Sequence, residues 1–225
     1  MSQSQIAVII PAAGSGERLG AGIPKALVEI HGLSLIERAV NNLVEVADTI
    51  VIAAPPGFEA KFRDLFGSLQ HDKKIHIVTG GITRSESVAN SLKAIDSEVK
   101  YVLIHDAARA FTPSALAKRV VSELIKGEKA VIPAIEVIDT IKVVDSQDYV
   151  SKTPDRSTLR AVQTPQGFSR EVIDKAHADG GEATDDAALV SHLGIPVKVI
   201  PGDPLARKIT TLDDLSWARE LAVQS

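Results

Sequence analysis

Short apolar segments alternate with helical patterns along almost the whole chain, and this alternation limits the possible folds more than any other feature. Buried strands are predicted at Ile6 to Ile10, Thr49 to Ala54, Ile75 to Val78, Tyr101 to Ile104, Ala130 to Ile135 and Val197 to Ile200. Helices are predicted at Leu35 to Val46, Phe58 to Leu69, Ser85 to Ile95, Pro113 to Lys126, Arg170 to Ala178, Asp185 to His192 and Leu212 to Ala222. Strands that alternate with helices predict an α/β fold with a doubly wound, mostly parallel sheet.

Residues 137–153 interrupt this alternation with two strand-like runs on either side of a polar turn at Asp145 to Asp148. This pattern predicts a β-hairpin inserted into one domain that spans residues 1–225. The hairpin carries several apolar side chains, and an isolated hairpin is only marginally stable in water. We therefore expect it to pack on a second copy of the chain. The alternative is that it covers an edge of its own sheet.

A glycine-rich loop directly follows the first predicted strand. Residues 11–25 read PAAGSGERLGAGIPK and include two cations, Arg18 and Lys25. Glycines allow the backbone to approach an anion and leave amide N–H groups free to point at it, while the two cations add charge. Pro24 stiffens the chain before Lys25, which suits a fixed cation. The loop predicts a phosphate site, with a simple turn between strand and helix as the alternative.

Two better-known phosphate-binding loops do not fit these residues. A P-loop needs a serine or threonine directly after its lysine, but Lys25 is followed by Ala26. A dinucleotide-binding loop needs the spacing G-x-G-x-x-G and an acidic residue at the end of the second strand. Here the glycine spacing is one residue longer, and the second strand ends in Ala53 and Ala54. The residues therefore disfavour both a P-loop and a dinucleotide-binding loop.

The composition favours a cytoplasmic protein with an ample core. Hydrophobic residues make up 44% of the 225 residues. The sequence contains no cysteine, no apolar run long enough to span a bilayer and no basic-then-apolar leader, so we expect neither disulfides nor membrane binding. The net charge of −4 argues against a nucleic-acid partner. An anionic ligand must then be held by a local cluster of arginines and lysines.

Polar clusters stand where two further strands end. One runs from Thr79 to Arg84, and the other is His105 to Arg109. The carboxyl ends of strands line the ligand crevice of an open α/β sheet, so both clusters are expected to meet the glycine loop at one site. The alternative for Asp106 and Arg109 is a simple ion pair. His105 is expected to be a packed histidine, because no second ligand stands at metal-binding spacing.

These motifs together resemble the 2-C-methyl-D-erythritol 4-phosphate cytidylyltransferase family of the non-mevalonate isoprenoid pathway. The glycine loop marks only the wider nucleotidyltransferase group. The order of the other motifs is more specific: Gly80-Gly81 with Arg84 and Ser87, HDAAR at 105–109, Asp139-Thr140, Asp155-Arg156, Thr164-Pro165-Gln166, Thr184-Asp185 and Lys208-Ile209-Thr210. The resemblance covers essentially the whole chain. It implies a Rossmann-like nucleotidyltransferase fold and a homodimer joined by the hairpin arm.

The resemblance also implies the reaction. A phosphate oxygen of methylerythritol phosphate attacks the α-phosphorus of CTP, and pyrophosphate leaves with the help of Mg²⁺. The attacking oxygen is already anionic near neutral pH, so no general base is needed. Catalysis then consists of in-line positioning and neutralisation of phosphate charge.

Site residues follow from the same resemblance. The catalytic cations would be Arg18, Lys25, Arg156 and Lys208. CTP would be bound by Ala12, Ala13, Gly14, Ser15, Gly16, Gly80, Gly81, Ser87 and Asp106, with Asp106 also near the metal ion. The acceptor would be bound by Arg109, Thr140, Thr164 and Thr184. Because the arm crosses the dimer in this family, Thr140 and Arg156 would serve the partner's site.

Other functions remain as alternatives at this point. A ribitol-5-phosphate cytidylyltransferase would share the CTP half of the site. A guanylyl- or uridylyl-transfer enzyme is a more distant alternative. A nucleotide-binding module would keep the fold but would not catalyse a reaction.

Overall fold

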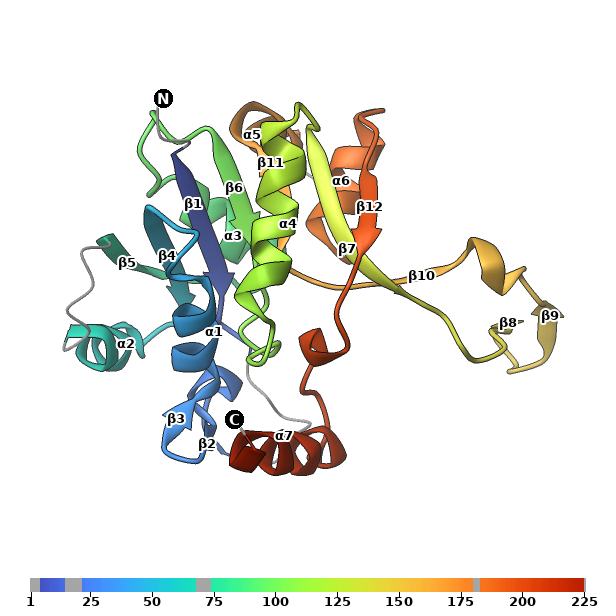
Figure 1. Ribbon diagram of the computed structural model, residues 1–225, viewed down its shortest axis with the longest axis horizontal. Helices are drawn as coiled ribbons and strands as arrows, with labels where there is room; N and C mark the ends of the chain where they lie inside the picture. The colour runs from blue at the N-terminus through green and yellow to red at the C-terminus, as the bar shows by residue number, and fades with distance from the viewer. Residues whose placement is uncertain (1–4, 15–21, 68–73, 180–182, 225) are drawn as a thin grey trace.

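The fold is built on one eight-stranded sheet (Figure 1). We describe it from a computed structural model that covers residues 5–14, 22–67, 74–179 and 183–224. The strands are β1 (Ile6–Pro11), β4 (Thr49–Ala54), β5 (Lys74–Thr79), β6 (Tyr101–Ile104), β7 (Ala130–Glu136), β10 (Arg160–Val162), β11 (Gln166–Ser169) and β12 (Lys198–Pro201). Strand β1 pairs in parallel with β4 and β6, β4 with β5, and β7 with β12. The predicted α/β class and the mostly parallel sheet are therefore confirmed.

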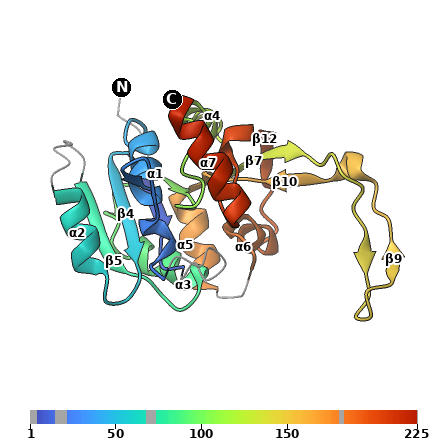
Figure 2. The same cartoon turned by 90° about the horizontal axis from the view of Figure 1, so that it is seen from below.

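Helices cover both faces of this sheet (Figure 2). One face packs against α1 (Leu35–Leu43), α2 (Glu59–Gly67) and α4 (Ser114–Ile125), and the other against α3 (Arg84–Leu92), α5 (Arg170–Ala178) and α6 (Asp186–His192). Successive side chains of a strand point to opposite faces. Accordingly, Val8 and Ile10 of β1 belong to the first core, while Ala7 and Ile9 belong to the second. Such two-sided burial explains why these strands read as continuous apolar runs.

The last helix, α7 (Leu212–Gln224), covers neither face of the sheet. It lies across the end of the molecule where the strands finish, beside the short strands β2 (Glu29–Ile30) and β3 (Leu33–Ser34) (Figure 1). Its buried residues Leu215 and Ala218 join Ile30, Ala110 and Ile209 in a third, smaller core. This third core fixes the segment before α7 against the carboxyl end of the sheet.

Strand β11 is not predicted by the sequence patterns. It runs antiparallel to both neighbours, β6 and β7, and so enters the centre of a parallel sheet in reverse. Its sequence QGFS contains a buried glutamine and a glycine, so neither apolar continuity nor alternation marks it as a strand. Glycine is needed here because a Cβ on Gly167 would lie 2.9 Å from Leu124 Cδ1 of α4 and even closer to Val120 Cγ1.

The predicted hairpin is present as an arm that extends away from the sheet (Figures 1 and 2). Its strands β8 (Val143–Val144) and β9 (Val150–Lys152) pair with each other and, among the described strands, with no other. Ile138 is 84% exposed and Val150 is 59% exposed, so the arm leaves its apolar side chains uncovered within this chain. The hairpin therefore does not cover an edge of its own sheet.

None of the helices in the described ranges is both long and apolar enough to cross a membrane.

Replacing Gly167 tests how tightly β11 packs beneath α4. Gly167→Ala should lower the free energy of unfolding by about 1–3 kcal/mol, because the added methyl overpacks the core against Val120. The cost should shrink in a Val120→Ala background, where the clashing methyl groups are gone. Urea denaturation measures all four proteins of this cycle.

Gly67→Ala is the matched control, since no atom of the described residues lies within 4 Å of a Cβ at that position. An unfolding free energy unchanged by Gly167→Ala would contradict the packing described here.

Candidate functional site

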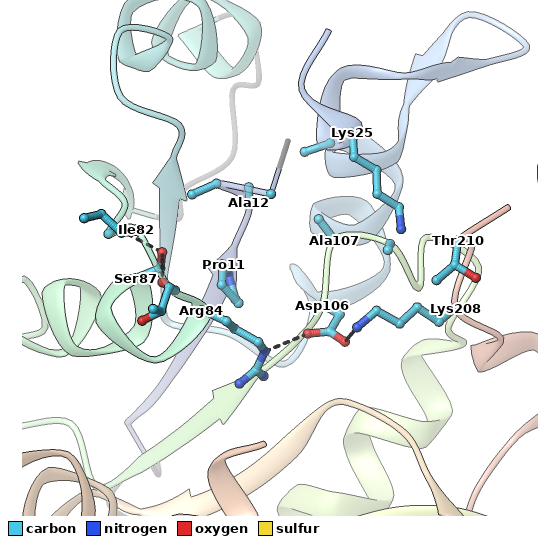
Figure 3. A pocket seen from close by; sticks show the side chains of 16 residues that line it. Pro11, Ala12, Lys25, Ile82, Arg84, Ser87, Asp106, Ala107, Lys208 and Thr210 are labelled. Atoms are coloured by element: carbon cyan, nitrogen blue, oxygen red, sulfur yellow. Dashed lines mark hydrogen bonds and ion pairs between the residues drawn. The ribbon is translucent and has the colours of Figure 1, made fainter. Parts of the chain in front are cut away.

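The carboxyl ends of β1, β5 and β6 open onto a pocket of about 360 Å³, here called the first pocket (Figure 3). Several predicted residues line it: Ala12, Ala13, Gly14, Lys25, Gly81, Ser87, Asp106 and Lys208. They come from the loop after β1, the short 3-10 helix η2 (Lys25–Leu27), the start of α3, the loop after β6, and the segment before α7. Segments that are far apart in sequence thus converge at one edge of the sheet, as the strand-end argument predicted.

Close packing of two loops shapes one side of the first pocket, where Gly80, also predicted to bind CTP, is buried and does not line the pocket itself. A Cβ on Gly80 would lie 2.6 Å from Ala13 Cβ, so only glycine allows the two loops to approach this closely. Ser87 Oγ accepts a hydrogen bond from the Gly81 amide at 3.0 Å and donates one to the Thr83 carbonyl at 3.0 Å. These contacts fix a slot at one side of the first pocket, lined by Ala13, Gly81 and Ser87.

Helix α3 begins at this slot because Thr83 and Glu86 form a capping box. The Glu86 amide donates to Thr83 Oγ1 at 3.1 Å, and the Thr83 amide donates to Glu86 Oε2 at 3.3 Å. The Ile82 amide also donates to Glu86 Oε2, at 2.7 Å. Capping satisfies amides that would otherwise lack partners at a helix start. The capping box therefore fixes the backbone position of Arg84, the first residue of α3.

A second pocket, of about 280 Å³, adjoins the first. It includes the predicted acceptor residues Arg109, Thr164 and Thr184, together with Gln163, Gln166, Asp185 and Val162. Three side chains, those of Arg84, Asp106 and Lys208, line both pockets. The two pockets therefore share one wall.

Asp106 is the centre of that shared wall. Its Oδ1 lies 3.1 Å from Arg84 Nε, and its Oδ2 lies 2.8 Å from Lys208 Nζ and 3.8 Å from Arg109 Nε. Figure 3 shows Arg84 and Lys208 reaching this carboxylate from opposite sides. Burial by itself would raise the pKa of Asp106, but the charges of Arg84 and Lys208 outweigh it and hold that pKa well below its usual range. Asp106 is therefore ionised at neutral pH.

Arg84 is held in turn by Asp186, at the first position of α6. Its Nη1 lies 2.7 Å from Asp186 Oδ2, and His177 Nε2 lies 3.0 Å from the other oxygen of that carboxylate. Burial would lower the pKa of Arg84, but the negative charges of Asp186 and Asp106 raise it instead. In the sequence, Asp186 indicates only helix-start chemistry, so its anchoring role is not predicted.

Thr164 connects the two sides of the second pocket. Its hydroxyl oxygen accepts a hydrogen bond from the Asp106 amide at 3.0 Å and lies 2.9 Å from His105 Nδ1. His105 is completely buried, and this burial lowers its pKa to about 4. The ring is therefore neutral at physiological pH.

Among the described residues, no group of three or more His, Cys, Asp or Glu could hold a metal ion.

Arg109 has structural contacts as well as a pocket position. Its Nη1 donates to the Ala206 carbonyl at 2.7 Å, and its Nη2 donates to the Val162 carbonyl at 3.2 Å. These bonds tie the loop after β6 to β10 and to the 3-10 helix η4 (Pro204–Ala206). Arg109 thus shapes the second pocket even before any ligand is considered.

Two predicted site residues lie away from both pockets, Thr140 in the arm and Arg156 three residues after it. Thr140 and Arg156 line neither pocket, both are exposed, and Arg156 Nη1 donates to the Ile138 carbonyl at 2.6 Å. Three further predicted residues, Ser15, Gly16 and Arg18, lie outside the described residues.

Sequence reasoning assigns no role to Arg84 or Thr210, although both line the first pocket. Arg84 appears in the sequence only as part of a motif, and its position at a helix start beside the sheet's carboxyl end is the signal that could have identified it. Thr210 also lines the first pocket, and its place two residues after Lys208 in an extended segment is the corresponding signal.

Comparison with known proteins agrees with this geometry. A family model described as 2-C-methyl-D-erythritol 4-phosphate cytidylyltransferase matches residues 6–224. The enzyme of that name from Nocardia farcinica is 44% identical over 98% of this chain and 95% of its own length. A second such enzyme, from Frankia casuarinae, is 43% identical over 98% of this chain and 82% of its own length.

Solved structures give the same result. The 2-C-methyl-D-erythritol 4-phosphate cytidylyltransferase of Thermus thermophilus superposes with a TM-score of 0.80 at 35% identity and covers 97% of this chain and 99% of its own. The 4-diphosphocytidyl-2C-methyl-D-erythritol synthase of Anaerococcus prevotii superposes with a TM-score of 0.85 at 31% identity, covering 98% and 99%. These similarities extend over almost the whole chain. The chain therefore belongs to the 2-C-methyl-D-erythritol 4-phosphate cytidylyltransferase family, whose members transfer the cytidylyl group of CTP to 2-C-methyl-D-erythritol 4-phosphate.

Proposed function

We propose that the first pocket holds CTP, that the second holds methylerythritol phosphate, and that the transfer takes place at their shared wall. The observation that carries this proposal is that Arg84, Asp106 and Lys208 line both pockets. Two reactants bound side by side would meet at these three side chains. Holding both in place converts a bimolecular reaction into an effectively unimolecular one.

The charges at the shared wall suit a reaction between two phosphates. In the first pocket the cations Lys25, Arg84 and Lys208 outnumber the single carboxylate of Asp106, which leaves a net positive charge among its described residues. This local excess occurs in a chain whose net charge is −4. Preorganised cations of this kind stabilise charge that builds up in a transition state.

The chemistry needs no general base from the protein. The acceptor is a phosphate monoester, whose second pKa is about 6, so its oxygens are anionic at neutral pH. One oxygen forms a new bond to the α-phosphorus of CTP, and the bond from that phosphorus to the bridging oxygen breaks, releasing pyrophosphate. His105, the histidine of the HDAAR motif, is buried and neutral, and it contacts Thr164 rather than a pocket.

The nucleotide would be bound by the loop after β1 and by the backbone slot. Ala12, Ala13 and Gly14, with the Gly80-Gly81 turn and Ser87, offer peptide groups that can read the edge of a base. Gly80 packs directly on Ala13 beside this slot, and we propose that the confined space favours a pyrimidine over a purine by size. Lys25 would neutralise the triphosphate and the α-phosphate during transfer. Ser15, Gly16 and Arg18 are proposed to complete this loop by similarity to the family.

The acceptor would be bound mainly by polar groups of the second pocket. Thr164 and Thr184 offer hydroxyl groups for the methylerythritol chain, and Arg109 adds positive charge. Lys208 lies where the two pockets meet, so it would direct the acceptor's phosphate towards CTP.

Magnesium would enter as part of the nucleotide complex. Asp106 is the single carboxylate among the described residues that line the first pocket, and both its oxygens are paired with cations. That donor set does not make a protein-only metal site. It does fit Mg²⁺, which is commonly held by one or two carboxylates plus substrate phosphates and water. When bound, the ion would neutralise phosphate oxygens, and Asp106 would be its protein contact.

The arm is proposed to complete the site of a partner subunit. Thr140 and Arg156 are displaced from both pockets of their own chain, and the apolar side chains of the arm are exposed. A homodimer in which each arm crosses to the other subunit would cover this apolar surface. It would also bring Arg156 to the partner's acceptor phosphate.

The activity itself is the first measurement. Purified protein with Mg²⁺ should release pyrophosphate from CTP only when methylerythritol phosphate is present, because the attacking group must be supplied. Parallel reactions with ribitol 5-phosphate, and with GTP or UTP in place of CTP, test acceptor and base selectivity. Faster turnover with ribitol 5-phosphate would overturn the proposed acceptor.

Lys25→Ala tests the proposed phosphate contact. We expect kcat to fall about a hundredfold or more, the scale of losing one preorganised charge contact to a transition state. Lys126→Ala is the matched control, because it removes the same charge from an exposed residue at the end of α4 that lines neither pocket. Steady-state pyrophosphate release measures both. A kcat unchanged by Lys25→Ala would remove Lys25 from the catalytic group.

Mixed dimers test the crossed arm. Lys25→Ala and Arg156→Ala, each nearly inactive alone, are mixed and allowed to exchange subunits. If each site takes Lys25 from one chain and Arg156 from the other, random pairing makes about a quarter of all sites intact. The expected result is recovery of about a quarter of wild-type activity.

The control mixture combines Lys25→Ala with Lys208→Ala. Both residues line the first pocket of the same chain, so exchange of the arm restores no complete site, and activity should stay at the level of the unmixed variants. Because a hybrid of these two variants carries one lesion in each pocket, every site stays damaged. Absence of recovery in the first mixture, once pull-down with two tags shows that hybrids have formed, would exclude the shared site.

A further inference from the structure

Asp214, in the first turn of α7, makes more contacts than a helix start requires. Its side chain is buried, and Oδ2 accepts hydrogen bonds from the amides of Thr210 and Thr211, at 2.8 and 2.9 Å, and from their hydroxyls, at 2.7 and 3.0 Å. The Asp214 amide donates back to Thr211 Oγ1 at 3.2 Å. The Thr211 pair alone would form a capping box. The contacts to Thr210 extend beyond it.

The second oxygen of the carboxylate holds Arg207. Asp214 Oδ1 lies 2.9 Å from Arg207 Nε and 2.5 Å from Arg207 Nη2, a two-pronged ion pair. The guanidinium also lies 5.2 Å from the ring centre of Trp217, which packs edge-to-face on Phe111 at 6.1 Å. One buried carboxylate therefore fixes both ends of residues 207–211.

Those residues lead directly into the site. In an extended segment, alternate side chains point in opposite directions. Ile209 is buried in the third core and its amide donates to the Ala108 carbonyl at 2.8 Å, whereas Lys208 and Thr210 line the first pocket. In Figure 3, Lys208 reaches Asp106 from this segment. Any shift of the segment would move Lys208 Nζ away from its 2.8 Å contact.

We propose that Asp214 is a positioning residue for the transfer reaction, which fixes residues 207–211 so that Lys208 is presented at the wall shared by the two pockets. The inference rests on the proposed role of Lys208. Asp214 itself touches neither pocket. It acts on the reaction through the lysine, and displacement of a reacting group by about 1 Å is enough to cost about a hundredfold in rate.

The test is a double-variant cycle measured by pyrophosphate release. Asp214→Asn keeps the shape but removes the charge, and it should lower kcat by about tenfold to a hundredfold. In a Lys208→Ala background the same change should have little further effect, because the group that it positions is gone. A purely structural role would lower activity by the same factor in both backgrounds, and that result would overturn the inference.

Asp213→Asn is the matched control. Asp213 is exposed in the same helical turn, so its replacement removes the same charge near the same helix start. We expect kcat to stay within about twofold of wild type, a change of less than about half a kcal/mol in the barrier. A loss equal to that of Asp214→Asn would assign the effect to the helix start in general and overturn the inference.

Trp217 gives a readout that does not depend on activity, since it is the single tryptophan of the chain. Asp214→Asn should change its fluorescence emission, because Arg207 is released from the ring, whereas Asp213→Asn should not. Unchanged emission would show that the segment has not moved and would overturn the inference.

Arg207→Met repeats the cycle should Asp214→Asn fail to fold. It leaves the threonine contacts in place, so a smaller loss of kcat is expected, again absent in the Lys208→Ala background. If Lys208→Ala is impaired but Arg207→Met and Asp214→Asn keep wild-type kcat, the inference is overturned while the proposed role of Lys208 stands. An unimpaired Lys208→Ala would refute the proposed role of Lys208 and, with it, the inference.

Discussion

A single buried carboxylate kept ionised among cations is the constraint on which the site depends. Asp106 is only 8% exposed, and burying an unpaired charge is costly, so the fold must bring counter-charges to it. Arg84 comes from the start of α3 and Lys208 from the segment before α7, so the pairing draws two distant parts of the chain onto the end of β6. Removing either partner would leave a buried charge poorly compensated. The same arrangement keeps cations oriented where phosphates are proposed to bind.

Supporting residues extend this arrangement outward in two directions. Asp186 holds the far side of Arg84, and Asp214 holds the segment that carries Lys208. Each supporting carboxylate stands in the first turn of a helix, where the helix dipole and free amides favour negative charge. The helix starts of α6 and α7 thus serve as fixed points for the cations of the site. This explains why α7 lies across the ends of the strands rather than on a face of the sheet.

Much of the fold follows from local sequence signals, because two-sided burial leaves continuous apolar runs at β1, β4 and β6. Strand β11 escapes prediction because its glycine and glutamine are required by contacts with α4 and α6, which no local pattern records. At the site, motifs draw attention to Lys25, Asp106 and Lys208. Motifs do not identify Asp186 or Asp214. The partner of Asp186, Arg84, is distant in sequence, and the bonds of Asp214 to Thr210 are not ones that a helix cap requires.

The reversed direction of β11 has a consequence for the order in which the chain can assemble. Before residues 166–169 exist, β6 has only β1 beside it, and β7 lacks β11 and β12, which both follow it in sequence. A growing chain therefore carries one edge of β6 unpaired until about three quarters of its length has been made. Unpaired strand edges are the surfaces through which chains aggregate. In this chain, such an edge stays open through the whole interval between synthesis of β6 and arrival of β11.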